Sequence, residues 1–265
     1  MLNHQRDHPV MKREIFATPR QIADLCDCYF YHEMDLPGYG HVEGEWDLRG
    51  KEQEYLGSVE LNGKRVLEIG TASGHLCFYM EKQGAEVIAY DLSVNEAWDM
   101  VPYQRYDWET ALSERRSHVR RINNAFWLAH QAFGSKTKMV YGSVYSIPRE
   151  IGPVDISVFG SVLLHVRDPF LALQNALTLT RETVIVTEPC SLPRQYLDKF
   201  TGADMIFLPD FVSTEPKETW WHMSPRLIQR FLGVLGFEKT KIRYHYQKRK
   251  GRSHRLCTIV GLRTN

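Results

Sequence analysis

One short stretch of this chain has acids and glycines at a spacing that is typical of a cofactor-binding site. Residues 65–74 read RVLEIGTASG and residues 85–91 read AEVIAYD, which is typical of a buried strand, a glycine turn, a helix and a second strand. Asp91 ends the second strand about 20 residues after the turn, where open α/β sheets hold the ribose of a nucleotide cofactor. The alternative is an ordinary tight turn, with a carboxylate that is solvated or caps the next helix.

The spacing of the small residues separates two classes of cofactor. A dinucleotide-binding turn has the pattern G-x-G-x-x-G, whose second glycine lets the backbone approach a pyrophosphate. Here Ala72 stands in place of that second glycine, and Glu68 precedes the turn. This acid would repel a pyrophosphate but suits an adenosine-containing cofactor with a free ammonium group. The expected contacts of such a cofactor with this segment are Glu68, Gly70, Thr71, Gly74, Asp91 and Leu92.

A candidate proton acceptor follows a later strand. Gly160 and Ser161 come directly after the apolar strand 154–159, where the backbone would face the cofactor, and His165 falls at the mouth of the site. Imidazole titrates near neutral pH and can remove a proton from an attacking group. The alternative is that His165 fixes its loop through a hydrogen bond to Asp168 or to the backbone.

Other segments offer further contacts. His222, beside two tryptophans, is a second candidate base or substrate contact, unless it only belongs to a packed aromatic cluster. Ser143 and Val144 follow a strand at 137–141, where this kind of sheet contacts adenine, and Ser143 could take the amino group.

The leading segment is rich in aromatic and ionisable side chains. It is expected to form an arm over the cofactor, with Trp46 against the adenosine or methyl side and Arg49 near the cofactor's carboxylate. The alternative is an N-terminal helix packed on the sheet.

An alternating run of strands and helices must hold these residues together. The patterns predict an α/β fold, a Rossmann-like, seven-stranded, mostly parallel sheet that closes with an antiparallel hairpin. Helices are expected at 75–83 and at 107–133. Two more are expected to begin at Asp168-Pro169 and at Ser224-Pro225, because aspartate or serine suits the N-cap of a helix and proline suits its first turn. The expected strands are 65–69, 86–91, 137–141, 154–159, 183–189, 239–246 and 255–262.

Residues 190–223 interrupt this alternation, because they carry prolines and aromatics without a clear period. Their position after the fifth strand predicts a lid over the ligand site, with a surface excursion over a sheet edge as the alternative. The expected organisation is an arm at 1–60, a cofactor-binding core at 61–189, the lid at 190–223, and a helix with a hairpin at 224–265 that completes the core.

Bulk properties exclude several classes of protein. With 265 residues, 43% hydrophobic composition and a net charge of +1, the chain resembles an ordinary globular protein without an overall attraction to nucleic acid or membrane. No apolar run approaches the ~20 residues of a membrane helix, and residues 1–20 do not resemble a signal peptide. Five scattered cysteines indicate free thiols and a cytoplasmic location, and no spacing predicts a metal site. The oligomeric state has no signal in the sequence.

One cluster of basic residues stands out near the end of the chain. The cluster lies on the predicted closing hairpin. A basic hairpin can contact the phosphates of RNA, but a charged edge strand also prevents sheets from pairing with each other. The cluster comprises Lys239, Lys241, Arg243, Lys248, Arg249, Lys250, Arg252 and Arg255.

The segment E-x-G-x-A-x-G with Asp91 resembles motif I of the class I S-adenosylmethionine-dependent methyltransferases. Together with YHEMDL at 31–36, GEWDLR at 44–49 and SVLLHVRDP at 161–169, it resembles a bacterial family similar to the tRNA wobble-uridine carboxymethyltransferases. That resemblance implies active-site roles for Trp46 and His165. Leu164 stands where those enzymes have a tyrosine, and their long N-terminal helical region is missing.

These departures favour S-adenosyl-L-methionine itself as the cofactor over its carboxylated form. The leading hypothesis is a methyltransferase that acts on a hydroxyl or amine of a small molecule. One alternative is a tRNA methyltransferase that acts on the wobble uridine. A second alternative is a non-catalytic regulatory subunit that keeps the methyltransferase fold.

Overall fold

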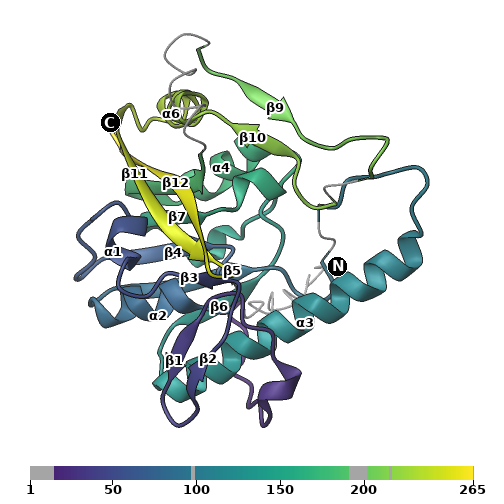
Figure 1. The fold of residues 1–265 in the computed structure, drawn as a ribbon. Coiled ribbons are helices and arrows are strands. Elements are labelled where there is room, and N and C mark those ends of the chain that lie inside the picture. Colours follow the sequence, from purple (N-terminus) through teal and green to yellow (C-terminus); the bar gives the residue numbers. More distant parts are fainter. Residues whose placement is uncertain (1–14, 97–98, 191–201, 215–216, 265) are drawn as a thin grey trace, which may run out of the picture.

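The computed structural model describes residues 15–96, 99–190, 202–214 and 217–264, and within them an eight-stranded sheet forms the centre of the molecule (Figure 1). Its strands are β3 (Trp46–Asp47), β4 (Arg65–Ile69), β5 (Glu86–Asp91), β6 (Lys138–Tyr141), β7 (Val154–Gly160), β8 (Thr180–Pro189), β11 (Lys239–Arg249) and β12 (Arg252–Leu262). They lie in the order β3-β11-β12-β8-β7-β4-β5-β6. The strands from β8 to β6 in this order are parallel, whereas β12 is antiparallel to both of its neighbours.

This arrangement confirms the predicted α/β fold with a mostly parallel sheet and a closing antiparallel hairpin. The hairpin strands are longer than expected, because only Lys250 and Gly251 form the turn. Both have positive φ, at 47° and 73°, as a tight two-residue turn between twisted strands requires.

An eighth strand comes from the arm. The two residues of β3 pair with Lys248 and Arg249 of β11. A strand of two residues has no periodicity, so the sequence pattern does not reveal it. The pairing brings Trp46 to the edge of the sheet, next to the end of the hairpin.

The helices are α1 (Glu52–Tyr55), α2 (His75–Lys82), α3 (Trp108–Phe133), α4 (Pro169–Leu177) and α6 (Pro225–Val234), with short 3-10 helices at Leu25–Asp27, Arg149–Ile151 and Leu163–His165. The predicted helix starts are confirmed. The side chains of Asp107, Asp168 and Ser224 each accept a backbone N–H of the first turn, and proline follows the last two caps.

Two hydrophobic clusters cover the two faces of the sheet. Along β4, Val66 packs into the cluster built with the arm, α2 and α3, while Leu67 packs into the cluster built with α4 and α6. Both side chains are fully buried. This two-sided burial explains why the parallel strands read as continuous apolar runs.

Between Tyr29 and Arg49 the arm forms short strands and loops rather than a helix packed on the sheet, which was the alternative. It contains the hairpin of β1 (Met34–Leu36) and β2 (Gly40–Val42) before β3 and α1. Gly44 passes so close to the backbone of His32 that a Cβ there would lie 2.4 Å from its carbonyl carbon. The close approach fixes the path that leads to Trp46.

The described part of the lid segment contains the antiparallel strands β9 (Met205–Phe207) and β10 (Trp221–Met223), at the margin of the molecule in Figure 1. The rest of that prediction, at 191–201 and 215–216, lies outside the described residues. Trp220 N–H donates to the carbonyl of Leu164 at 2.8 Å, which ties the segment to the 3-10 helix at 163–165. Within the described residues, none of the helices is both long and apolar enough to span a membrane.

Candidate active site

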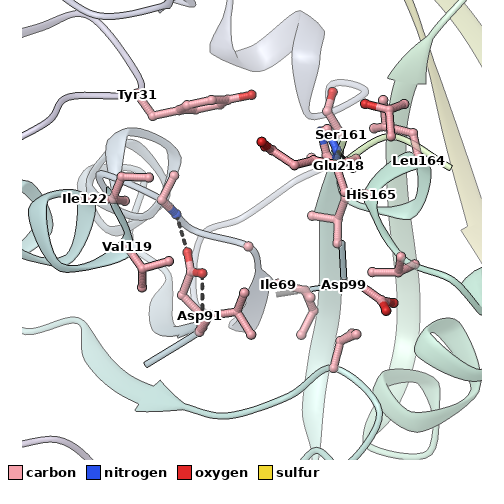
Figure 2. Close-up of a pocket in the computed structure, with 18 of the residues that line it drawn as sticks. Tyr31, Ile69, Asp91, Asp99, Val119, Ile122, Ser161, Leu164, His165 and Glu218 are labelled. Carbon is pink, nitrogen blue, oxygen red and sulfur yellow. Dashed lines mark hydrogen bonds between the residues drawn. The ribbon is translucent and has the colours of Figure 1, made fainter. Parts of the chain in front are cut away.

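A cavity of about 700 Å³ opens at the carboxyl ends of the parallel strands, where the strand order reverses between β4 and β7. Its size lies in the range of ~300–1,000 Å³ that is usual for small-molecule pockets. Figure 2 shows Asp91, Val119 and Ile122 on one side of it, and Ser161 and His165 on the other. The cavity therefore joins the predicted cofactor end to the predicted base.

Asp91 lies at the end of β5 and lines the cavity, as predicted. Its Oδ2 accepts the N–H of Ala72 at 2.6 Å, and its Oδ1 accepts the N–H of Leu92 at 2.7 Å. Burial raises the pKa of this carboxyl to about 6, although the two backbone bonds oppose the shift. Each carboxylate oxygen keeps a further lone pair, so Asp91 can also accept the two hydroxyls of a ribose.

The glycine turn after β4 brings bare backbone to the cavity wall. Gly70 lines the cavity with φ at +74°, and an added Cβ would lie 2.5 Å from a methyl group of Val162. Gly74 is the N-cap of α2 and does not line the cavity. Gly70 is therefore the predicted glycine of this turn that a cofactor can touch, while Gly74 shapes the start of the helix.

Glu68 lies buried beneath this turn. Its Oε2 accepts the hydroxyl of Thr71 at 3.1 Å and the thiol of Cys77 at 2.6 Å. Burial raises the pKa of Glu68 to about 7. Glu68 lines a small adjoining cavity of about 20 Å³, while Thr71 lines neither. Both residues brace the turn from below, and a contact between Glu68 and the cofactor's ammonium group stays a prediction.

The predicted adenine contacts Ser143 and Val144 line the same cavity, and so does Leu92, which was predicted as a cofactor contact. Leu92, Ser143 and Val144 lie at the ends of β5 and β6. The Asn123 amide donates to the Leu92 carbonyl at 3.1 Å, and the Tyr90 hydroxyl donates to the Ser143 carbonyl at 2.8 Å. These bonds hold the two strand ends together with α3 as one rigid wall.

His165 ends the 3-10 helix after β7 and lines the cavity. Its Nδ1 lies 2.6 Å from the carbonyl oxygen of Glu218. A carbonyl only accepts, so Nδ1 carries the hydrogen and Nε2 is left to accept a proton. Burial, followed by the charges of Arg249 and Arg115, lowers the pKa of His165 to about 4, so the ring is neutral at pH 7.

The loop that carries His165 is held by groups from β8. Gly160 and Ser161 both line the cavity, as predicted, and Ser161 has a left-handed φ of 55°. Its N–H donates to the Thr187 carbonyl at 2.7 Å, and the N–H of Leu163 donates to Oε1 of Glu188 at 2.8 Å. The backbone anchors therefore set where the 3-10 helix begins.

Glu188 was not among the site residues predicted from the sequence. Its carboxyl is buried, which raises its pKa to about 8, and its Oε2 has no hydrogen-bond partner within the described residues. The signal was present in the sequence, because an acid at the end of the apolar strand 183–189 must be paired or protonated if the strand is buried.

Trp46 also lines the cavity, in agreement with the predicted arm. Its ring is buried, and the guanidinium of Arg249 lies 5.7 Å from the ring centroid. Tyr31, from the same arm, projects across the cavity opposite Asp91 (Figure 2). The arm thus covers the open edge of the site with two aromatic rings.

Two further predicted site residues, Arg49 and His222, also lie outside the cavity wall. The guanidinium of Arg49 is held by Asp47 at 2.8 Å, Asp35 at 3.0 Å and Glu33 at 3.1 Å, and Arg49 does not line the cavity. Three carboxylates hold it on the outer side of the arm. His222 belongs to β10, opposite Ile206 of β9, and is not part of the cavity wall either.

One face of α3 also lines the cavity, and this role was not predicted from the sequence. Its lining residues follow the i, i+3, i+4, i+7 spacing of one helix face, and that spacing was the signal that could have revealed them. The lining residues that were not predicted include Tyr31, Glu45, Ile69, Asp99, Arg115, His118, Val119, Ile122, Asn123, Lys217, Glu218 and Arg249. No group of three or more metal-binding side chains occurs in the described parts of the chain.

The family comparison matches residues 47–235, well over half of the chain, to the family described as a methyltransferase domain. The chain belongs to this methyltransferase family. Together with Asp91 and the order of the strands, this membership identifies an S-adenosylmethionine-dependent methyltransferase, and the predicted enzyme class and cofactor are confirmed. No curated protein matches the sequence. The narrower resemblance to the wobble-uridine enzymes stays a prediction.

Solved structures share the fold at low sequence identity. The N-terminal domain of EvdMO1, in the presence of SAH and D-fucose, has a TM-score of 0.54 and 15% identity, and the match covers 89% of this chain and 91% of that one. The Burkholderia thailandensis 1,6-didemethyltoxoflavin-N1-methyltransferase, with bound 1,6-didemethyltoxoflavin and S-adenosylhomocysteine, has a TM-score of 0.51 and 14% identity, over 82% and 78%. At this identity the likeness concerns the fold.

Proposed function

We propose that this methyltransferase moves the methyl group of S-adenosylmethionine to a hydroxyl or amine of a small molecule. The observation that carries the proposal is the single cavity that joins Asp91 to His165. The cofactor supplies an electrophilic methyl group on a sulfonium centre. The enzyme then needs mainly to align the two reactants, because the reaction is an in-line displacement.

The residues at the sheet ends fit such a cofactor. Asp91 would accept the ribose hydroxyls, and the bare backbone at Gly70 and Gly160 would face the methionine part. At Gly160 a Cβ would already meet the hydroxyl of Tyr55 at 3.0 Å, so a larger residue would crowd this wall. Leu92 and Val144 would flank the adenine.

His165 would act as the general base for a hydroxyl acceptor. The Glu218 carbonyl holds Nδ1–H, so the ring is oriented before the acceptor arrives and the same bond stabilises the cation that forms when Nε2 takes the proton. An amine acceptor that enters without its proton would not need this step.

Incubation of the enzyme with S-adenosylmethionine labelled in the methyl group and a pool of small metabolites tests the proposal. We expect labelled product from the wild type and at least ~100-fold less turnover from His165→Ala, with the affinity for S-adenosylhomocysteine nearly unchanged. His222→Ala is the matched control, because His222 lies outside the cavity. Equal turnover of His165→Ala and the wild type would leave His165 with a structural role only.

The contacts of the basic hairpin favour a small acceptor over RNA. Arg249 and Lys250 pair with Glu45, at 2.9 and 3.8 Å, and the guanidinium of Arg255 stacks 4.3 Å from the ring centroid of Tyr244. These charges serve contacts within the chain. A steep salt dependence of RNA binding that disappears on charge reversal at Lys248 and Lys250 would instead support the tRNA alternative.

A further inference from the structure

We infer that Trp220 is a positioning residue for His165, because it holds the segment 217–220 against the loop that carries this histidine. The inference rests on the proposed function, since it concerns the residue assigned as the general base. Residues 217–220, the returning segment, pass over the cavity and lead into β10.

The orientation of His165 depends on a bond from outside its own loop. The ring ends a 3-10 helix of three residues, Leu163–His165, and its Nδ1–H donates to the carbonyl of Glu218 at 2.6 Å. Figure 2 shows the two residues together at one end of the cavity. Without this acceptor either ring nitrogen could face the cavity, because neutral imidazole can carry its hydrogen on either one. The returning segment therefore sets which nitrogen accepts a proton.

Trp220 fastens the returning segment with hydrogen bonds to two different loops. Its backbone N–H donates to the carbonyl of Leu164 at 2.8 Å, and its indole N–H donates to the carbonyl of Asp99 at 2.6 Å. The side chain is buried, and the guanidinium of Arg167 lies 4.9 Å from its ring centroid. A buried indole N–H requires a partner, so these contacts select one position of the ring.

The residue that accepts the indole N–H is itself bonded to the loop of His165. The carboxylate of Asp99 accepts the backbone N–H of Arg167 at 2.6 Å and the hydroxyl of Tyr145. These three residues belong to the segments that follow β5, β6 and β7. Trp220 therefore joins the returning segment to a bonded unit that includes the loop of the base.

Trp220 itself does not line the cavity, whereas its neighbours Glu218 and Thr219 do. Its substitution leaves the predicted cofactor contact Asp91 in place. A change at Trp220 would therefore reach the reaction through the groups that it holds. This separation allows a positioning role to be told apart from a role in cofactor binding.

Two other contacts hold the returning segment independently of the indole. The carboxylate of Glu218 forms an ion pair with Arg115 of α3, and the N–H of Val101 donates to the carbonyl of Lys217 at 3.0 Å. Because these anchors remain, variants at Trp220 are expected to fold.

The titration of His165 reports whether the returning segment covers the ring. Burial, followed by the charges of Arg249 on β11 and Arg115 on α3, lowers the pKa of His165 to about 4 from its ordinary 6.5. The acid on the returning segment, Glu218, pairs with Arg115. If the segment moves away, water reaches the ring, and its pKa should rise towards 6.5.

NMR of the protein with isotope-labelled histidine tests the inference without an acceptor, and His165→Gln identifies the signals of His165. In the wild type we expect the hydrogen on Nδ1 and a neutral ring from pH 8 down to ~5. Trp220→Phe keeps an aromatic ring but removes the indole N–H, and Trp220→Ala removes the ring as well. Both should show a mixture of the two tautomers and a titration that begins near pH ~6, with the larger effect in Trp220→Ala.

Trp127→Phe is the matched control. The indole N–H of Trp127 is also buried and donates to the hydroxyl of Tyr141 at 2.9 Å, but Trp127 belongs to α3 and does not line the cavity. The control should keep the tautomer and the titration of His165 seen in the wild type.

Turnover provides the second readout, with methyl-labelled S-adenosylmethionine and the pool of small metabolites. We expect Trp220→Phe to lower turnover by about tenfold and Trp220→Ala to lower it further, because a misplaced base removes a proton less efficiently. The affinity for S-adenosylhomocysteine should stay within threefold of that of the wild type, and Trp127→Phe should turn over like the wild type.

A folded Trp220→Ala variant in which His165 keeps the tautomer and titration of the wild type would overturn the inference. The same holds if His165 of the wild type carries its hydrogen on Nε2, or if Trp127→Phe and Trp220→Phe lose turnover equally. If the wild type transfers no methyl group, the proposed function fails, while the NMR of His165 still decides whether Trp220 positions the ring.

Discussion

Replacement of Asp91 by asparagine tests the cofactor end of the site. The carboxylate accepts one backbone N–H on each oxygen and is expected to accept one ribose hydroxyl on each as well. Asparagine keeps one acceptor oxygen and turns an NH₂ group towards either Ala72 N–H or Leu92 N–H. Hydrogen bonds to a charged group contribute ~1.5–3 kcal/mol each, and at ~2 kcal/mol each the loss of one to two of them costs ~2–4 kcal/mol of binding free energy. The affinity should fall by ~30- to ~1,000-fold.

Titration calorimetry with S-adenosylhomocysteine measures this change, with circular dichroism to show that the variant is folded. Asp155→Asn is the matched control, because Oδ2 of Asp155 also accepts a backbone N–H, that of Arg65 at 2.8 Å, but lies outside the cavity. The control should bind with the affinity of the wild type. An Asp91→Asn variant that folds and binds within threefold of the wild type would refute the role assigned to this carboxylate.

Three further variants test the frame of the site. Ala72 has a left-handed φ of 50°, so Ala72→Gly should raise the free energy of unfolding by up to ~1 kcal/mol in urea titrations, and a loss of stability would contradict this. Gly44→Ala should lower it by ~1–3 kcal/mol, because the new Cβ meets the backbone of His32; an unchanged midpoint would show that the arm gives way freely. Glu188 has a folded pKa of about 8, above its ordinary 4.5, so its contribution to stability is full below pH 4.5 and is lost as pH rises towards 8. Relative to Glu188→Gln, the wild type should therefore lose up to ~1.4 kcal/mol per pH unit between pH 5 and 8, and a difference that does not vary with pH would argue against a protonated Glu188.

The parts of the molecule that could be predicted from sequence are those with local signals. The turn at Gly70 and the caps at Asp168 and Ser224 each depend on residues within a few positions of one another, and Asp91 follows the turn at a spacing of about 20 residues that is typical of this kind of sheet. The buried parallel strands are recognisable for a similar reason, since burial on both faces requires a continuous apolar run.

The charged residues that line the cavity have no such local signal. Glu45, Arg115, Glu218 and Arg249 meet only because β3 joins the sheet edge, α3 crosses the open side and the segment after β9 returns over the cavity. Each of them reads in the sequence as an ordinary surface charge. Their pairing depends on tertiary contacts that a single sequence does not display.

The predicted cofactor contact of Arg49 came from local sequence alone, and the structure places Arg49 outside the cavity. Its position near Trp46 suggested a cofactor contact, but Glu33 and Asp35 lie two residues apart on an extended segment and therefore project to the same side. With Asp47 they form a carboxylate cluster that binds the guanidinium outside the cavity. The spacing of Glu33 and Asp35 can be read from the sequence. The fold that brings these two acids next to Asp47 and Arg49 cannot.

A calorimetric titration of the wild-type protein with S-adenosylmethionine and S-adenosylhomocysteine at neutral pH tests most directly whether the cavity is the cofactor site. We expect both to bind at one site per chain and to compete with each other, because one cavity holds Asp91, the turn at Gly70 and the predicted adenine contacts. If neither compound binds, the assignment of this cavity as the cofactor site is wrong.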